Sequence, residues 1–182
     1  TITLSIDTIR PTIAITSGAA TLAKGETTTI TFTLSESATD FVEDDISVSG
    51  GTLSDFSGSG ITYTATFTPT DNSTTNGVIS VASTKFSDAA GNTNDDGSQA
   101  NNTLTLSVDT LRPTIAITSD VDSLKKGETA TITFTLSEQT DFNADDISVS
   151  GGTLSGFSGS GTTSLSFTTS DDINRSGTTS LS

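Results

Sequence analysis

The sequence contains no cysteine, histidine, methionine or tryptophan, and only one tyrosine and three prolines in 182 residues. Without cysteine there is no disulfide framework and no thiolate metal site. Without histidine, imidazole catalysis and histidine-ligated zinc are excluded within these residues. Basic residues are also scarce, 7 against 22 acidic ones, which gives a formal net charge of −15. Nucleic acid and anionic membranes need a basic surface, so neither is expected as a partner.

Long apolar runs and helical periodicity are missing as well. No run is long enough to cross a membrane, so we expect no membrane insertion of these residues. Hydrophobic residues make up 31% of the chain, and threonine, serine, glycine, aspartate and isoleucine predominate. Threonine and isoleucine favour strands, whereas serine, glycine and aspartate favour turns. The composition therefore predicts an all-β protein, and the recurrence of strand patterns argues against disorder.

An internal repeat of about 100 residues organises the chain. Asp7–Thr16 returns as Asp109–Thr118, an offset of 109 − 7 = 102 residues. Thr1–Asp7 matches Thr103–Asp109, which closes the repeat. The predicted organisation is a last strand of a preceding repeat at 1–8, a complete domain at 9–109, and at 110–182 an incomplete second domain without its final strand or strands.

Alternation of apolar and polar residues predicts about seven short strands in each complete repeat. The apolar positions of the first repeat are Ile13 and Ile15, Ile30 to Leu34, Ile46 and Val48, Leu53, Ile61 to Phe67, Ile79 and Val81, and Leu104 to Val108. Seven strands in roughly 100 residues fit an immunoglobulin-like sandwich, whereas a solenoid would need a much shorter repeat. We therefore predict tandem immunoglobulin-like β-sandwiches. Pro11 and Pro113 precede the first strands and restrict the arginine before them, so the link between domains is predicted to be short and stiff.

Acidic residues gather in loops that share a pole of the predicted sandwich. One pole receives Asp7, Glu36, Asp45, Asp88 and Asn92. The opposite pole carries Asp71 and Asp109, to which the next repeat would add Glu138 and Asp146. Oxygen ligands without histidine or cysteine suit a hard cation, and Ca²⁺, which takes roughly 6–8 oxygens in flexible geometry, is favoured over Mg²⁺. The alternative is that these acids are solvated loop residues.

The stretch Asn92-x-Asn94-x-Asp96-Gly97 is similar to the opening of an EF-hand loop. It lacks the first aspartate, Thr103 stands where the twelfth-position glutamate would be, and no helices flank it. An EF-hand is therefore not predicted, and the alternative is a looser calcium loop.

Several motifs together resemble bacterial immunoglobulin-like repeats. They are Val108-Asp109-Thr110-x-x-Pro113, Phe67-Thr68-Pro69-Thr70, Gly51-Thr52-Leu53-Ser54-x-Phe56-Ser57-Gly58-Ser59-Gly60 and Asp88-Ala89-Ala90-Gly91-Asn92. Such repeats occur in giant surface adhesins and biofilm-associated proteins. The resemblance implies an extracellular extender on a bacterial cell surface, a string of neighbouring repeats stiffened by Ca²⁺ at their junctions that holds a distal binding domain away from the cell.

The resemblance also implies calcium ligands. In the family these are the acid before the linker proline, the aspartate of the Asp-Ala-Ala-Gly-Asn loop and the acid that closes the second strand. They map to Asp7 and Asp109, to Asp88, and to Glu36 and Glu138. The second copy stops before its own Asp-Ala-Ala-Gly-Asn loop.

Two other functions fit parts of the sequence. In a filament or sheath, the strand at residues 1–7 would complete the sandwich of an identical chain, head to tail. A sugar-binding or glycosidase module would use paired carboxylates, but sugar sites usually present exposed aromatic platforms, and the alternation points Tyr63 inward. No histidine or well-placed lysine could activate a serine or threonine nucleophile, so an enzyme is not expected.

Overall fold

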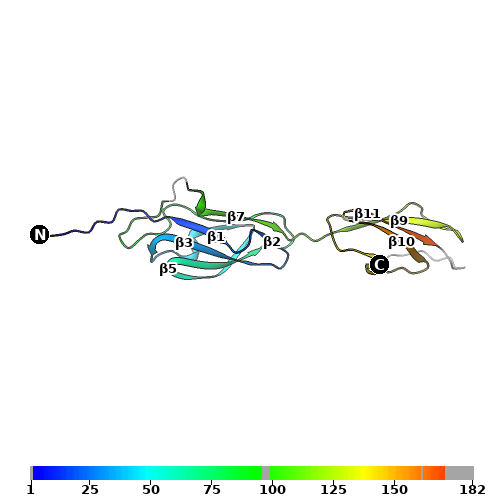
Figure 1. Cartoon of the computed structure of the whole chain (residues 1–182), viewed down its shortest axis with the longest axis horizontal. Coiled ribbons are helices and arrows are strands. Elements are labelled where there is room, and N and C mark those ends of the chain that lie inside the picture. Colours follow the sequence, from blue (N-terminus) through cyan, green and yellow to red (C-terminus); the bar gives the residue numbers. More distant parts are fainter. Residues whose placement is uncertain (1, 96–98, 161, 171–182) are drawn as a thin grey trace. The chain divides into compact units, whose positions relative to one another are not determined.

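A computed structural model describes residues 2–95, 99–160 and 162–170 (Figure 1). The chain divides into two compact units, Thr1–Leu111 and Arg112–Ser182, which are described separately. Among the described residues no helix is long and apolar enough to cross a membrane.

The described residues of unit 1 form seven strands in two sheets (Figure 1). One sheet has the order β1-β3-β5, with β1 at Ile13–Ser17, β3 at Thr28–Ala38 and β5 at Gly51–Pro69. The other has the order β2-β7-β6-β4, with β2 at Thr21–Ala23, β7 at Thr103–Asp109, β6 at Gly77–Val81 and β4 at Ile46–Ser49. Neighbouring strands are antiparallel except β2 and β7. Two 3₁₀ turns, η1 at Glu43–Asp45 and η2 at Ala100–Asn102, complete the unit. The predicted seven-strand sandwich is confirmed.

The core lies between the two sheets, where alternation places the apolar side chains. Ile30 and Phe32 of β3 are fully buried, and Val81 and Leu106 are fully buried on the other sheet. Aromatic rings pack edge to face around Phe41. Tyr63 is buried among them and donates its hydroxyl hydrogen to Ala38 O at 3.1 Å. The inward orientation predicted for Tyr63 is therefore confirmed, so its ring forms no exposed platform.

Two features of unit 1 differ from the sequence prediction. The short strand β2 was not predicted, because Leu22 is its only inward residue and a single residue gives no alternation to count. Leu53 and Ile61 to Phe67 were predicted on separate strands, but both lie on β5. This strand doubles back on itself: Thr70 N donates to Gly50 O at 3.0 Å, and a Cβ at Gly51 would lie 2.4 Å from the Phe67 ring.

The described part of unit 2 forms one sheet in the order β10-β11-β9-β8. Its strands are β8 at Ile115–Ser119, β9 at Thr129–Leu136, β10 at Thr153–Ser160 and β11 at Thr163–Ser170, with a 3₁₀ turn, η3, at Ala144–Asp146. Phe134 is 2% exposed, as the repeat predicts. Ile115 and Ile117 are 44% and 42% exposed, whereas their counterparts Ile13 and Ile15 are 1% and 6% exposed. In unit 1 a second sheet covers Ile13 and Ile15. No second sheet occurs in the described part of unit 2, so Ile115 and Ile117 are left uncovered there.

The N-terminal segment at residues 2–12 belongs to no strand, and Figure 1 draws it as a thin blue trace leading into unit 1. Ile2, Leu4 and Ile6 are 89%, 80% and 80% exposed. The matching positions of β7 include Leu106 and Val108, which are buried between the sheets. Thr1 lies outside the described residues. That residues 1–8 complete a preceding repeat stays a prediction.

Candidate metal site

Three carboxylates converge at the pole of unit 1 where the chain enters β1. Asp7 lies on the segment before β1, Glu36 near the end of β3, and Asp88 in the connection between β6 and β7. One oxygen of each carboxylate lies within 4.8 Å of one oxygen of each of the others. Asp7 is exposed, Glu36 half-buried and Asp88 buried. Carboxylates this close repel one another, which favours either a bound proton or a bound cation.

Glu36 has a side-chain oxygen that no donor among the described residues reaches. Its Oε1 is buried and has no hydrogen-bond partner among the described residues. Burial raises the pKa of Glu36, and the negative charges of Asp7 and Asp88 raise it further. A buried carboxylate oxygen without a donor is unfavourable unless it gains a proton or a metal ion.

Asp88 is held by the loop that follows it. Asn92 donates through its Nδ2 to Asp88 Oδ2 at 2.8 Å and through its backbone N to Oδ1 at 2.8 Å, and Ala90 N donates to Oδ1 at 2.9 Å. These hydrogen bonds, with the Asn92 side chain first, lower the pKa of Asp88 despite burial. Gly91, at φ 87°, closes the turn. The hydrogen bonds thus favour the ionised form of Asp88, whereas burial and the neighbouring charges disfavour the ionised form of Glu36.

Asp40 fixes the position of this loop against β3. Ser87 donates its backbone hydrogen to Asp40 Oδ1 at 2.9 Å and its hydroxyl hydrogen to Oδ2 at 2.5 Å. Burial raises the pKa of Asp40, but the hydrogen bonds from Ser87 outweigh that effect and lower it. A bridge between Ala38 and Asp88 adds to the attachment. This supporting role was not predicted, since nothing in the sequence distinguishes Asp40 from the other acids of its loop.

Several predicted ligands have other contacts in the structure. Asp45 Oδ2 accepts from Val42 N and Asp146 Oδ2 from Asn143 N, both at 3.0 Å, so each acid caps a 3₁₀ turn. Asp71 lies 3.8 Å from Lys24 Nζ. None of these acids joins the Asp7–Glu36–Asp88 group, which is the one cluster of its kind among the described residues.

The two remaining predicted ligands, Asp109 and Glu138, were expected at the second junction. Asp109 Oδ1 accepts from Leu111 N at 3.2 Å, as Asp7 Oδ1 accepts from Ile9 N at 3.1 Å. Glu138, the counterpart of Glu36, also has a buried Oε1 with no hydrogen-bond partner among the described residues. Metal binding by any of the nine predicted ligands stays a prediction.

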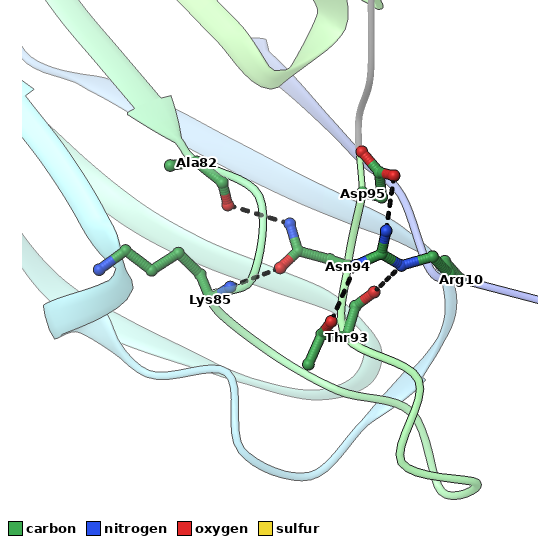
Figure 2. A network of polar contacts seen from close by, with 6 residues as sticks. All are labelled: Arg10, Ala82, Lys85, Thr93, Asn94 and Asp95. Atoms are coloured by element: carbon green, nitrogen blue, oxygen red, sulfur yellow. Dashed lines mark hydrogen bonds and ion pairs between the residues drawn. The ribbon is translucent and has the colours of Figure 1, made fainter.

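The stretch that is similar to an EF-hand loop is occupied by internal hydrogen bonds. Asn94 is 0% exposed, and its Oδ1 accepts from Lys85 N at 2.6 Å and Phe86 N at 3.1 Å. Its Nδ2 donates to Ala82 O at 3.0 Å, as Figure 2 shows. Asn94 thus holds the loop together, and its side-chain oxygen already has two donors. Asp96 lies outside the described residues.

Comparisons with known proteins identify a family model and similar solved structures. A family model described as a bacterial Ig-like domain matches residues 7–106 and again 109–182. No curated protein matches the chain significantly. Among solved structures, one of FdeC, described as a broadly conserved Escherichia coli adhesin that elicits protection against urinary tract infections, is 16% identical with a TM-score of 0.45. The match covers 87% of this chain and 55% of that chain, so this chain spans about half of its length.

Proposed function

Since the chain belongs to the bacterial Ig-like domain family and carries two copies of the domain in tandem, we propose that it is a structural extender of a bacterial surface adhesin, stiffened by Ca²⁺ where one domain meets the next. The observation that carries the proposal is the Asp7–Glu36–Asp88 cluster at the start of unit 1. Its partners are the neighbouring repeats of the same chain, and its place is outside the cell. The role is structural and requires no catalysis.

The cluster has the chemistry of a calcium site. Three carboxylates provide hard oxygen ligands, and Ca²⁺ completes its shell readily with backbone carbonyls and water. The unpartnered Oε1 of Glu36 would gain a partner, and the repulsion that raises the pKa of Glu36 would be relieved. Affinities of extracellular modules are typically ~10⁻⁴–10⁻³ M.

Such a site would stiffen the chain because its ligands come from different segments. Asp7 lies on the segment that leads into the domain, whereas Glu36 and Asp88 belong to the sandwich itself. A cation bound by all three would tie that segment to the domain. In a row of repeats, one tie at each start would make a flexible string into an extended rod.

Thermal unfolding with calcium and with a chelator tests this proposal. A ligand that binds only the folded state raises the unfolding midpoint in proportion to the logarithm of its concentration. We expect calcium to raise the midpoint of the unit 1 transition, and Glu36→Gln to remove most of that rise. Glu43→Gln is the matched control, because it removes the same charge from an exposed residue of η1. A calcium effect as large in Glu36→Gln as in Glu43→Gln, or no effect in the unchanged chain, would contradict the proposed site.

A second function, a filament or sheath built by strand addition, has one observation in its favour. Ile2, Leu4 and Ile6 alternate along the N-terminal segment and are at least 80% exposed. Such a segment suits addition to the sheet edge of another sandwich. Replacing all three by serine keeps Asp7 and should abolish any assembly of the chain seen by sedimentation. Assembly that persists in this variant would exclude strand donation.

A further inference from the structure

The segment between two domains repeats as Asp-Thr-x-Arg-Pro, at 7–11 and at 109–113. Unit 1 contains contacts of the first copy with the sandwich that it enters and of the second copy with the sandwich that it leaves. We propose that the threonine and the arginine of this motif are positioning residues. The threonine fastens the linker to the sandwich before it, and the arginine fastens it to the sandwich after it. The linker aspartate is thereby held in place without a cation. The inference deepens the proposed function and rests on it only where calcium affinity is concerned.

Arg10 fastens the first linker to the loop between β6 and β7. Its Nη1 donates to Asp95 Oδ2 at 2.7 Å, its Nε to Thr93 O at 2.9 Å and its Nη2 to Thr93 Oγ1 at 3.0 Å, as Figure 2 shows. Asp95 N donates in return to Pro11 O at 3.0 Å. A half-exposed ion pair alone contributes little. The planar guanidinium, however, engages two residues at fixed angles in a way that lysine cannot.

The loop that receives Arg10 is itself rigidly held. Thr93 and Asp95 flank Asn94, whose buried side chain bonds three backbone groups of the same loop. Figure 2 shows Asn94 facing Ala82 and Lys85 while Thr93 and Asp95 face Arg10. Arg10 therefore anchors the linker to a fixed part of unit 1.

Thr110 fastens the second linker to the loop between β5 and β6. It is 2% exposed. Its backbone N donates to Ser73 O at 2.9 Å, its hydroxyl donates to Thr70 O at 2.7 Å, and the same hydroxyl accepts from Ser73 N at 2.9 Å. A buried hydroxyl that both donates and accepts is fully used, so its removal leaves backbone groups without partners.

Between these two anchors the motif leaves a single residue. It is Ile9 in the first linker, 69% exposed, and Leu111 in the second, 46% exposed. Its backbone N donates to the linker aspartate, at Asp7 Oδ1 or Asp109 Oδ1, which turns the chain locally. In the first linker, Arg10 thus also restricts Asp7, whose carbonyl oxygen is contacted by Asn92 Nδ2 at 3.4 Å.

Backbone ¹⁵N relaxation in the presence of a chelator tests the anchors without calcium. In the unchanged chain we expect order parameters near ~0.85 at Arg10 and Thr110, typical of rigid backbone. Arg10→Lys should lower those of Ile9 and Arg10 toward ~0.6 or less and leave Thr110 unchanged. Thr110→Val should lower the order parameters of residue 110 and Leu111 and leave those of Ile9 and Arg10 unchanged. The control Thr105→Val makes the same change on an exposed side chain of β7 and should alter neither. Unchanged order parameters in both anchor variants would overturn the inference.

Calcium titration of the same variants tests the positioning of Asp7. We expect Arg10→Lys to weaken calcium binding by roughly tenfold, as the loss of a group that orients a ligand typically does, and Thr105→Val to leave it unchanged. An affinity unaltered in Arg10→Lys would mean that Arg10 does not position Asp7. If the unchanged chain binds no calcium, the proposed cation site fails, while the relaxation measurements still decide whether the anchors exist.

Discussion

Glu36 is the residue at which protons and a cation would compete. Its pKa lies above the ordinary value of 4.5 because the carboxylate is buried and faces Asp7 and Asp88. A group with a raised folded pKa binds more protons in the folded state, so its contribution to stability grows as the pH falls through the folded pKa toward the unfolded one. The pKa values of Asp88 and Asp40 are lowered, so their contribution is present at neutral pH and is lost as the pH falls below the ordinary value of 3.8.

We therefore predict a pH profile for unit 1 in a chelator. The urea midpoint should rise as the pH falls from neutral toward 4.5, and it should drop again below 3.8 as Asp88 and Asp40 take up protons. Glu36→Gln should remove the part of the rise that Glu36 causes, whereas Glu43→Gln should keep it. Identical profiles for the two variants would show that the rise comes only from the general loss of negative charge.

At the level of single residues, the sequence predicted all three members of the cluster as ligands, but it could not distinguish them from the other predicted ligands. Asp7, Glu36 and Asp88 were among nine predicted ligands, because the topology of a sandwich places their segments at one pole. Selection depends on side-chain hydrogen bonds between distant segments. Asp45 looked equivalent to Glu36 but caps its own turn, and Ser87 is bound to Asp40 across 47 positions of the chain.

At the level of elements, the ring of Phe67 locks β5 and β6 together. It is fully buried, and a Cβ at Gly51 or at Gly77 would lie 2.4 Å or 2.5 Å from its Cζ. Both glycines are needed because the ring fills the space that a side chain would occupy. Gly77→Ala should therefore destabilise unit 1 by about 1–3 kcal/mol through overpacking.

The matched test is a double-mutant cycle with Phe67→Leu, followed by urea unfolding. In the Phe67→Leu background, Gly77→Ala should be much less destabilising, because the smaller side chain frees the space. Gly18→Ala is the control, since the nearest atom to its added Cβ is Thr28 Oγ1 at 3.3 Å, well beyond the 2.5 Å that separates the added Cβ at Gly77 from the Phe67 ring. Equal effects of Gly77→Ala in both backgrounds would contradict the packing argument.

The same elements show why the strands were only partly predictable. Alternation identified β1, β3, β4, β6 and β7 because each carries at least two apolar side chains at alternate positions. Strand β2 buries one, and the fold-back of β5 depends on glycines packed against Phe67. Contacts of this kind join residues whose spacing in the sequence is not periodic, so an alternation pattern cannot predict them.

At the level of the whole molecule, the net charge of −15 complicates every calcium experiment. Any divalent cation screens the repulsion among the acids and stabilises a compact state to some degree. A specific site differs from screening in its location. The described residues contain one group of three acids whose oxygens lie close enough to hold a metal ion, and this group lies in unit 1.

Hydrogen exchange with calcium and with magnesium separates the two effects. We predict that calcium protects the end of β3 and the loop that carries Asp88, while β8 and β9 of unit 2 change little. Magnesium at the same concentration should give no such local protection, because it gives up its water reluctantly and demands stricter geometry. Equal protection of both units by either cation would identify the effect as screening of the molecular charge. Protection confined to the pole of Asp7 would instead mean that a bound ion couples the segment before β1 to the sandwich, as extension of a row of repeats requires.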